Sequence, residues 1–86
     1  MVGFHLKQVA MIVKDNATLR AILDWGHRSY DLRRDGYVDV FTSTLSNGYV
    51  RKLRHRSTGR VITLSVLGSC VTQQSSGRVV YKRDYV

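Results

Sequence analysis

The sequence contains no proline and no glutamate, and it has a single cysteine among its 86 residues. With only Cys70, no disulfide can form within the chain, which fits a reducing compartment. No apolar run approaches the roughly 18 residues that a membrane-spanning helix needs. The N-terminus also lacks a basic region followed by an apolar run and a small-residue cleavage site. We therefore expect a cytoplasmic protein without a membrane segment.

Negative charge is scarce as well. Six Asp residues are the only acidic residues, against fourteen Lys and Arg, so the formal net charge is +8 and the pI is near 10.3. A basic domain of this size usually meets a polyanion, most often nucleic acid. Hydrophobic residues make up 43% of the chain, which suffices for a modest core and argues against disorder. We treat residues 1–86 as one small basic domain.

The sequence also lacks the motifs of known catalytic, metal and nucleotide sites. No glycine-rich loop leads into a helix, so there is no nucleotide fingerprint, and Gly59 and Gly77 are interpreted as turn residues. The three histidines are far apart in sequence and Cys70 stands alone, a spacing that does not suit a metal site. We expect neither a cofactor nor a metal.

What the sequence does contain is a run of alternating, β-rich residues over 36–67. Asn47-Gly48 favours a two-residue type I′ hairpin, because both central residues of that turn need positive φ. With these two residues at the tip, Phe41 faces Arg54 and Asp39 faces Arg56. One face then carries Phe41, Ser43, Leu45, Val50, Lys52, Arg54 and Arg56, and the other carries Val38, Val40, Thr42, Tyr49, Arg51, Leu53 and His55.

A second turn follows at Ser57-Thr58 and Gly59. A loop of two or four residues places Leu53 opposite Ile62, whereas a three-residue loop would turn the next strand over. We choose the even loop because one buried face fixes the register strongly. Ile62, Leu64 and Val66 then join the apolar face with Val38, Val40 and Leu53, and Thr63 and Ser65 join the cationic face.

The remaining elements complete an α+β fold. Residues 4–13 are predicted as a first strand, residues 17–33 as a helix capped by Asp15 or Asn16, residues 73–77 as a polar loop and residues 78–85 as a last strand. Leu19, Ile22, Leu23 and Trp25 should pack on the apolar side of the sheet. We expect a single helix on a four- to five-stranded, mainly antiparallel sheet in the order β-α-β-β-β-β. So small a core often gains from dimerisation, and we expect a homodimer.

The candidate site is the cationic strand with its neighbours. We expect Lys52, Arg54 and Arg56 to hold phosphates, Arg51 and Arg60 to flank them, and Tyr37 or Phe41 to stack on bases. A two-stranded ribbon of this kind can enter the major groove of duplex DNA, and a flat basic sheet can follow a single strand. The alternative is an ordinary solvated sheet face, since edge strands often carry cations against aggregation.

Two further groups of residues are weighed against ordinary surface roles. Arg20, His27, Arg28, Arg33 and Arg34 either extend the basic footprint or form an exposed helix face. His55, which lies among Arg51, Arg54 and Arg56, is a candidate base of a small ribonuclease toxin, although nothing in the sequence fixes a second catalytic partner.

The sequence favours a non-enzymatic nucleic-acid-binding protein, accessory or regulatory, that binds DNA or RNA through its basic β-ribbon. The first alternative is a small inhibitor or adaptor of the phage or plasmid type, with its cations against an acidic protein partner and Phe41, Leu45 and Val50 as the apolar centre. The second alternative is the ribonuclease toxin.

Overall fold

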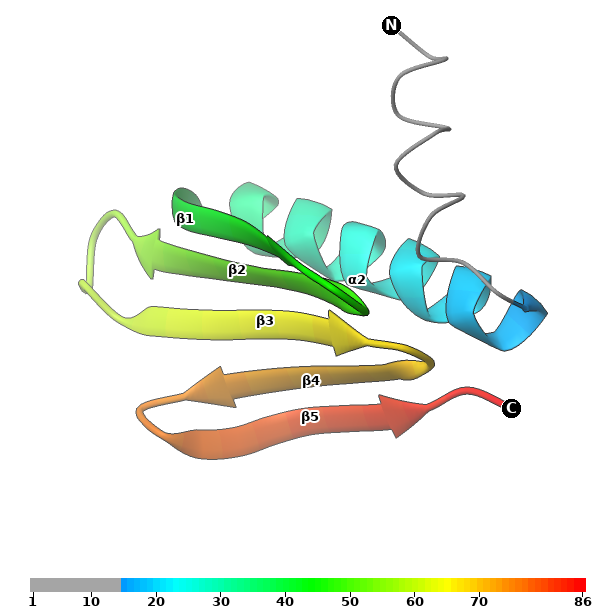
Figure 1. Ribbon diagram of the computed structural model, residues 1–86. Helices are drawn as coiled ribbons and strands as arrows, with labels where there is room; N and C mark the ends of the chain where they lie inside the picture. The colour runs from blue at the N-terminus through cyan, green and yellow to red at the C-terminus, as the bar shows by residue number, and fades with distance from the viewer. Residues whose placement is uncertain (1–14) are drawn as a thin grey trace, which may run out of the picture.

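A computed structural model describes residues 15–86 as two layers, with one helix lying across one face of a five-stranded sheet (Figure 1). The elements are α2 (Asn16–Arg34), β1 (Tyr37–Leu45), β2 (Gly48–His55), β3 (Val61–Leu67), β4 (Cys70–Ser75) and β5 (Arg78–Asp84). The strands follow one another in the order β1-β2-β3-β4-β5, and each neighbouring pair is antiparallel. The predicted α+β class is confirmed, while the strand predicted over 4–13 lies outside the described residues.

The helix begins and ends where the sequence indicates. The Asp15 carboxylate accepts a hydrogen bond from the Thr18 backbone N–H at 2.8 Å, and so caps the first turn. The helix continues through Gly26 to Arg34, with Arg33 and Arg34 at the negative end of its dipole. Gly36 then turns the chain into β1 with a φ of 106°, a conformation that favours glycine.

The buried stripe of the helix is narrower than predicted and runs through Thr18, Ala21, Trp25 and Ser29. The small side chains on either side of Trp25 let the helix come close to the sheet, so the indole can reach it. With this stripe against the sheet, Leu23 and Tyr30 face outward and are 53% and 59% exposed. The prediction that Leu19 and Leu23 pack on the sheet is therefore wrong, whereas Trp25 is buried and Ile22 is half-buried against the core.

The core lies between helix and sheet and is centred on β2, β3 and β4. Leu53 pairs with Ile62 and Arg51 with Leu64, as the even-length loop requires. The loop spans 56–59 and is closed by the His55 N–H, which donates to the Arg60 carbonyl at 2.8 Å. The sheet residues that pack under the helix are Tyr37, Leu53, Ile62, Leu64, Val66 and Val71.

The first hairpin differs from the prediction in its turn. Gly48 pairs with Leu45, so the two-residue turn is Ser46-Asn47, and none of the three turn-region residues from 46 to 48 has positive φ. Phe41 consequently faces Lys52 and not Arg54. The register differs from the predicted one by two residues, which leaves every side chain from Phe41 to Arg54 on its predicted face.

A bulge in β1 overturns one part of that prediction. The register shifts between Asp39 and Phe41, so Val38 pairs with Arg54, and Tyr37 turns toward the helix. Val38 and Val40 were expected in the core, but they are exposed, because one extra residue in a strand reverses the facing of all residues beyond it. Tyr37 takes the buried place instead.

The prediction of a polar loop over 73–77 is also wrong. Strand β4 extends to Ser75, and only Ser76 and Gly77 form the turn, with φ values of 54° and 75°. Positive φ at both central residues is the type I′ pattern, which therefore occurs here and not at Asn47-Gly48. The added strand β4 brings β5 into the sheet beside it.

Two glycine substitutions test this packing in opposite directions. A Cβ on Gly48 would lie 1.8 Å from the Val66 carbonyl oxygen, whereas a Cβ on Gly26 would meet nothing within 4 Å. We expect Gly48→Ala to lower the free energy of unfolding by more than about 3 kcal/mol, because strands β2 and β3 would have to separate. Gly26→Ala should raise it by about 1 kcal/mol through helix propensity. Urea denaturation of both variants measures this, and a stable Gly48→Ala protein contradicts the close strand approach.

Candidate nucleic-acid interface

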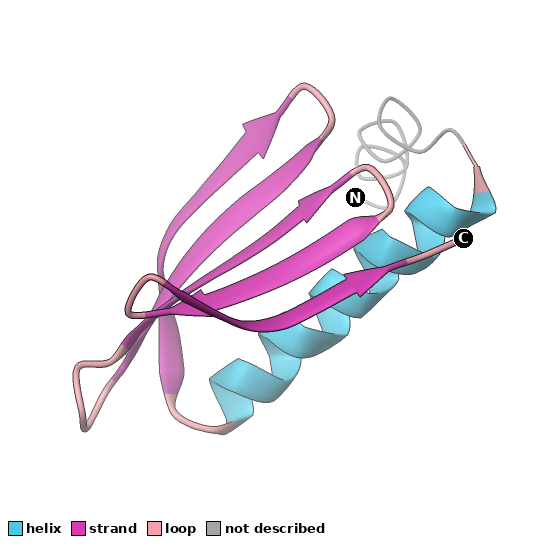
Figure 2. Cartoon of the chain, turned by 90° about the horizontal axis from the view of Figure 1, so that it is seen from below, coloured by secondary structure: helices cyan, strands magenta, loops and turns pink. Residues whose placement is uncertain are grey.

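The sheet face opposite the helix is called the open face here. Among residues 15–86 no helix or loop crosses it, as the view along the sheet shows (Figure 2). The strand registers place on this face Val38, Phe41, Ser43, Leu45, Val50, Lys52, Arg54, Val61, Thr63, Ser65, Leu67, Cys70, Thr72, Gln74, Val79, Lys82 and Asp84. The open face is therefore a mixture of apolar, polar and cationic side chains, with one carboxylate at the end of β5.

Lys52 and Arg54 form the cationic centre of the open face. They lie two residues apart on β2 and are both exposed. Phe41 pairs with Lys52 from β1 and is 53% exposed, and Thr63 pairs with Lys52 from β3. Two cations thus stand next to an aromatic ring that solvent reaches.

The carboxylates are gathered away from these cations. All six acidic residues lie within the described part of the chain, and Asp15, Asp24, Asp31 and Asp35 lie on the helix or at its ends. Asp84 alone has an open-face register, at the end of β5 beside Cys70. Within residues 15–86 the ion pairs at 4.0 Å or less all use Asp39, and they join it to Arg33 and Arg51. Lys52 and Arg54 are not neutralised by this chain's own described carboxylates.

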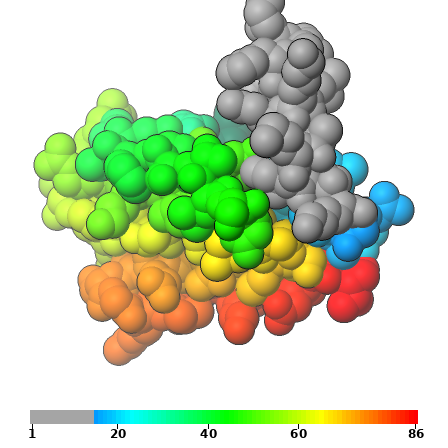
Figure 3. Space-filling view, viewed as in Figure 1, coloured from blue at the N-terminus to red at the C-terminus, as the bar shows by residue number. Residues whose placement is uncertain are grey.

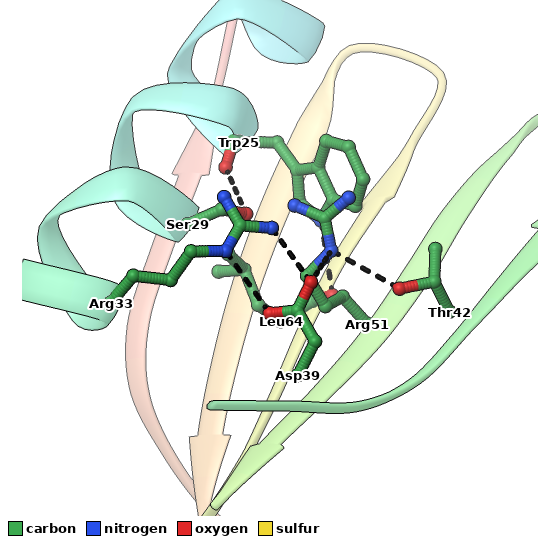
Figure 4. A network of polar contacts seen from close by, with 7 residues as sticks. All are labelled: Trp25, Ser29, Arg33, Asp39, Thr42, Arg51 and Leu64. Carbon is green, nitrogen blue, oxygen red and sulfur yellow. Dashed lines mark hydrogen bonds and ion pairs between the residues drawn. The ribbon is translucent and has the colours of Figure 1, made fainter. Parts of the chain in front are cut away.

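Asp39 lies on the helix side and not opposite Arg56 as predicted. It pairs with Leu53 across the bulged strand. Its two carboxylate oxygens accept hydrogen bonds from Arg33 Nε and NH2, at 3.1 and 2.8 Å (Figure 4). These bonds hold the pKa of Asp39 below its usual value. The β1 bulge therefore removes a carboxylate that would otherwise stand beside the cations of β2.

Arg51 also faces the helix. Its guanidinium lies 4.2 Å from the centre of the Trp25 ring, and its Nε donates to Thr42 Oγ1 at 3.2 Å. Burial lowers the pKa of Arg51 below its usual value. The position of the side chain between helix and sheet, visible in Figure 4, makes Arg51 part of the packing and separates it from Lys52 and Arg54.

The other predicted site residues fall into two groups. Tyr37 is only 7% exposed and packs edge-on against His55, with ring centres 4.8 Å apart, so its faces are not available for stacking. Arg56 and Arg60 lie past the end of β2, in or next to the loop at one end of the open face. The structure thus brings together Lys52, Arg54 and Phe41, sets Arg56 and Arg60 at the rim, and places Tyr37 and Arg51 on the helix side.

Sequence reasoning missed the contribution of the last two strands. Lys82 shares the open face through its pairing with Thr72, and Gln74 lies beside Thr63. Only Cys70 and Val71 are apolar in 70–75, so no alternation of apolar and polar residues marks this segment as a strand. Without β4, the position of β5 could not be derived.

The basic residues of the helix do not extend the open face. Arg28 stacks on the Tyr81 ring at 3.3 Å and donates to Gln73 Oε1 at 3.3 Å, and the Tyr81 hydroxyl donates to Asp24 at 2.9 Å. Arg33 is held by Asp39. These contacts agree with the interpretation of the basic helix residues as a separate face of the protein. They do not support a continuation of the basic ribbon.

The His55 ring forms hydrogen bonds with three backbone groups. Its Nδ1 accepts hydrogen bonds from the N–H groups of Ser57 and Thr58 at 3.1 and 3.3 Å. Because Nδ1 is an acceptor, the proton resides on Nε2, which donates to the Asp35 carbonyl at 2.9 Å. Both ring nitrogens are used in holding the loop against the helix end, so this geometry gives His55 a structural task.

We expect the His55 ring to be the neutral tautomer with its proton on Nε2. Long-range proton–nitrogen NMR correlations at neutral pH should show an unprotonated Nδ1 and a protonated Nε2 for this residue. His27, which is exposed on the helix, serves as the control and should average between tautomers. A protonated Nδ1 on His55 is incompatible with the two amide bonds described above.

Within residues 15–86, no group of three or more His, Cys, Asp or Glu side chains is arranged to hold a metal ion. Among residues 15–86, no helix combines the length and the apolar character needed to cross a membrane. No family model, curated protein or solved structure gives a significant match to the chain. The functional argument therefore rests on the open face itself.

Proposed function

We propose that this protein is a non-enzymatic, cytoplasmic nucleic-acid-binding protein that holds a single strand against its open face. The observation that carries the proposal is the pair Lys52 and Arg54, exposed beside Phe41 and free of carboxylate partners in the described chain. Cations of this kind bind phosphates, and an exposed ring offers a stacking surface for a base. A homodimer remains a prediction.

A single strand fits this face better than duplex DNA does. The major groove is about 12 Å wide and admits a helix or a two-stranded ribbon. Here β1 is the edge strand and β2 is also paired with β3 in a five-stranded sheet, so the two-stranded ribbon is not free to enter a groove by itself. A broad sheet face with cations and an aromatic residue is instead typical of surfaces that follow unpaired strands.

The double substitution Lys52→Gln and Arg54→Gln tests the cationic centre. It should weaken binding to oligonucleotides of any sequence, because phosphate contacts carry no base information. The slope of log affinity against log salt should flatten by roughly 0.7 for each lost phosphate contact on a single strand. Fluorescence anisotropy with labelled single-stranded DNA, RNA and duplex DNA at several salt concentrations measures both effects.

The matched control is Arg20→Gln and Arg34→Gln, which removes the same charge from the helix. Arg20 and Arg34 are exposed on the layer away from the open face. If the two double variants lose affinity equally, net charge and not the open face accounts for binding, and the site assignment is wrong.

Phe41 tests the stacking component. Phe41→Ala should lower affinity by about 1–3 kcal/mol, the usual contribution of one base on an aromatic ring. Phe41→Leu retains apolar contact without the aromatic face and should lose most of the same affinity. Thermal unfolding of both variants serves as the control, since this half-exposed side chain contributes little to the core. Full affinity in Phe41→Leu would remove stacking from the proposal.

A second candidate function is binding of an acidic protein, as an inhibitor or adaptor. The observation in its favour is the number of large apolar side chains exposed on and beside the open face, including Val38, Val40, Phe41, Leu45, Val61 and Leu67. Exposed apolar side chains beside cations can form the contact surface for an acidic protein. Capture of a partner by the immobilised protein after nuclease treatment, abolished by Phe41→Ala, favours this candidate over nucleic acid.

A further inference from the structure

Two hollows adjoin at the loop end of the sheet. The larger, about 460 Å³, opens on the open face and is lined by Lys52, Gly59, Arg60, Val61, Thr63, Gln74, Ser76 and Gly77. The smaller, about 280 Å³, is lined by Arg60, Ser75, Ser76, Arg78 and Val80. Arg60 and Ser76 line both. Figure 3 shows the yellow-green atoms of the β2–β3 loop and the orange atoms of the β4–β5 turn at this same end of the molecule.

The lining of the hollows suits an anion. Lys52, Arg60 and Arg78 supply positive charge, and no carboxylate lines either hollow. Hydroxyl and amide groups of Thr63, Gln74 and Ser76 add hydrogen-bond donors. The carboxylate of the open face, Asp84, is at the opposite end of β5 from Arg78. An anion in these hollows would therefore meet three cations and no acidic side chain.

Arg60 is well placed to serve both hollows at once. Its backbone is held on both sides, because its carbonyl accepts from the His55 N–H at 2.8 Å and its own N–H donates to Thr58 Oγ1 at 3.2 Å. The side chain itself is exposed and has no ion pair among the described residues. A guanidinium presents several N–H donors in a planar fork and can bind two phosphate oxygens together.

The surrounding backbone leaves room for a bulky anion. Added Cβ atoms on Gly59 and Gly77 would meet no atom within 4 Å, so the loop and the turn stand clear of each other. Among residues 15–86, no aromatic residue lines either hollow, so the described lining offers no surface on which a base would stack. The chemistry of the hollows matches the phosphates of a strand and not its bases.

We propose that the hollows around Arg60 are a phosphate-binding site, through which the backbone of a bound strand leaves the open face. This inference rests on the proposed function. Lys52 and Arg60 hold a phosphate in the larger hollow, and Arg60 and Arg78 hold the next phosphate in the smaller one. The strand thus runs from Phe41 across Lys52 and over the rim between the β2–β3 loop and the β4–β5 turn.

The test compares two arginines that carry the same charge. Arg60→Gln should lower the affinity for a labelled oligothymidylate about tenfold, or about 1.4 kcal/mol, because a charge-assisted hydrogen bond to a phosphate is lost. Arg83→Gln is the control, because Arg83 pairs with Val71 on the helix side of β5 and lines neither hollow. It should change the affinity less than threefold. Equal losses in the two variants overturn the phosphate site while leaving nucleic-acid binding in place.

A second arm separates this inference from the proposed function. Inorganic phosphate is titrated into the unmodified protein, and the backbone amide signals of Gly59, Thr63, Ser76 and Gly77 are followed by NMR. Saturable shifts at these residues, lost in Arg60→Gln, support the phosphate site even if no oligonucleotide binds and the proposed function fails. Absence of such shifts, together with an Arg60→Gln affinity equal to that of Arg83→Gln, overturns it.

Discussion

The position of Trp25 decides which face of the sheet becomes core and which stays free. Its indole N–H donates to the Leu64 carbonyl at 3.1 Å, and its ring stacks on Tyr49 with centres 5.1 Å apart, under the Arg51 guanidinium. A buried indole needs both a hydrogen-bond partner and apolar contact, and the face with Leu53, Leu64 and Val66 supplies them. With the single described helix fixed there, Lys52 and Arg54 remain on the opposite side.

The same arrangement separates the charges of the protein. Three arginines make contacts on the helix side of the sheet. Arg51 stacks on Trp25, Arg28 stacks on Tyr81, and Arg33 pairs with Asp39. The carboxylates of Asp24 and Asp39 are used in the same layer. The chain has only six side-chain carboxylates to neutralise fourteen cations, and nearly all of these carboxylates lie away from the open face. The cations of β2 and its rim that have no ion pair among the described residues, Lys52, Arg54, Arg56 and Arg60, contribute four of the positive charges behind the net charge of +8.

Much of this could be derived from the sequence, because alternation and loop parity are local properties. The pairing of Leu53 with Ile62 and the shared face of Phe41, Lys52 and Arg54 follow from them, and the start of the helix follows from its capping residue Asp15. The β1 bulge could not be derived, since no residue type signals it, and it exchanged Val38 for Tyr37 in the core. Gly48 was assigned to a turn for its conformational freedom, but the strand needs it because Val66 approaches so closely. The hollows at Arg60 depend on β4 and on tertiary contacts between loops, which the sequence pattern of either loop alone does not contain.

The central claim is that a polyanion contacts the sheet face opposite the helix. The most direct measurement is a map of backbone amide shifts on the ¹⁵N-labelled protein during titration with a short single-stranded oligonucleotide. The account predicts the largest shifts at Phe41, Lys52, Arg54 and Thr63, with little change along the exposed side of α2. Shifts concentrated on the helix around Leu23 and Tyr30, with the strand residues unaffected, would contradict it.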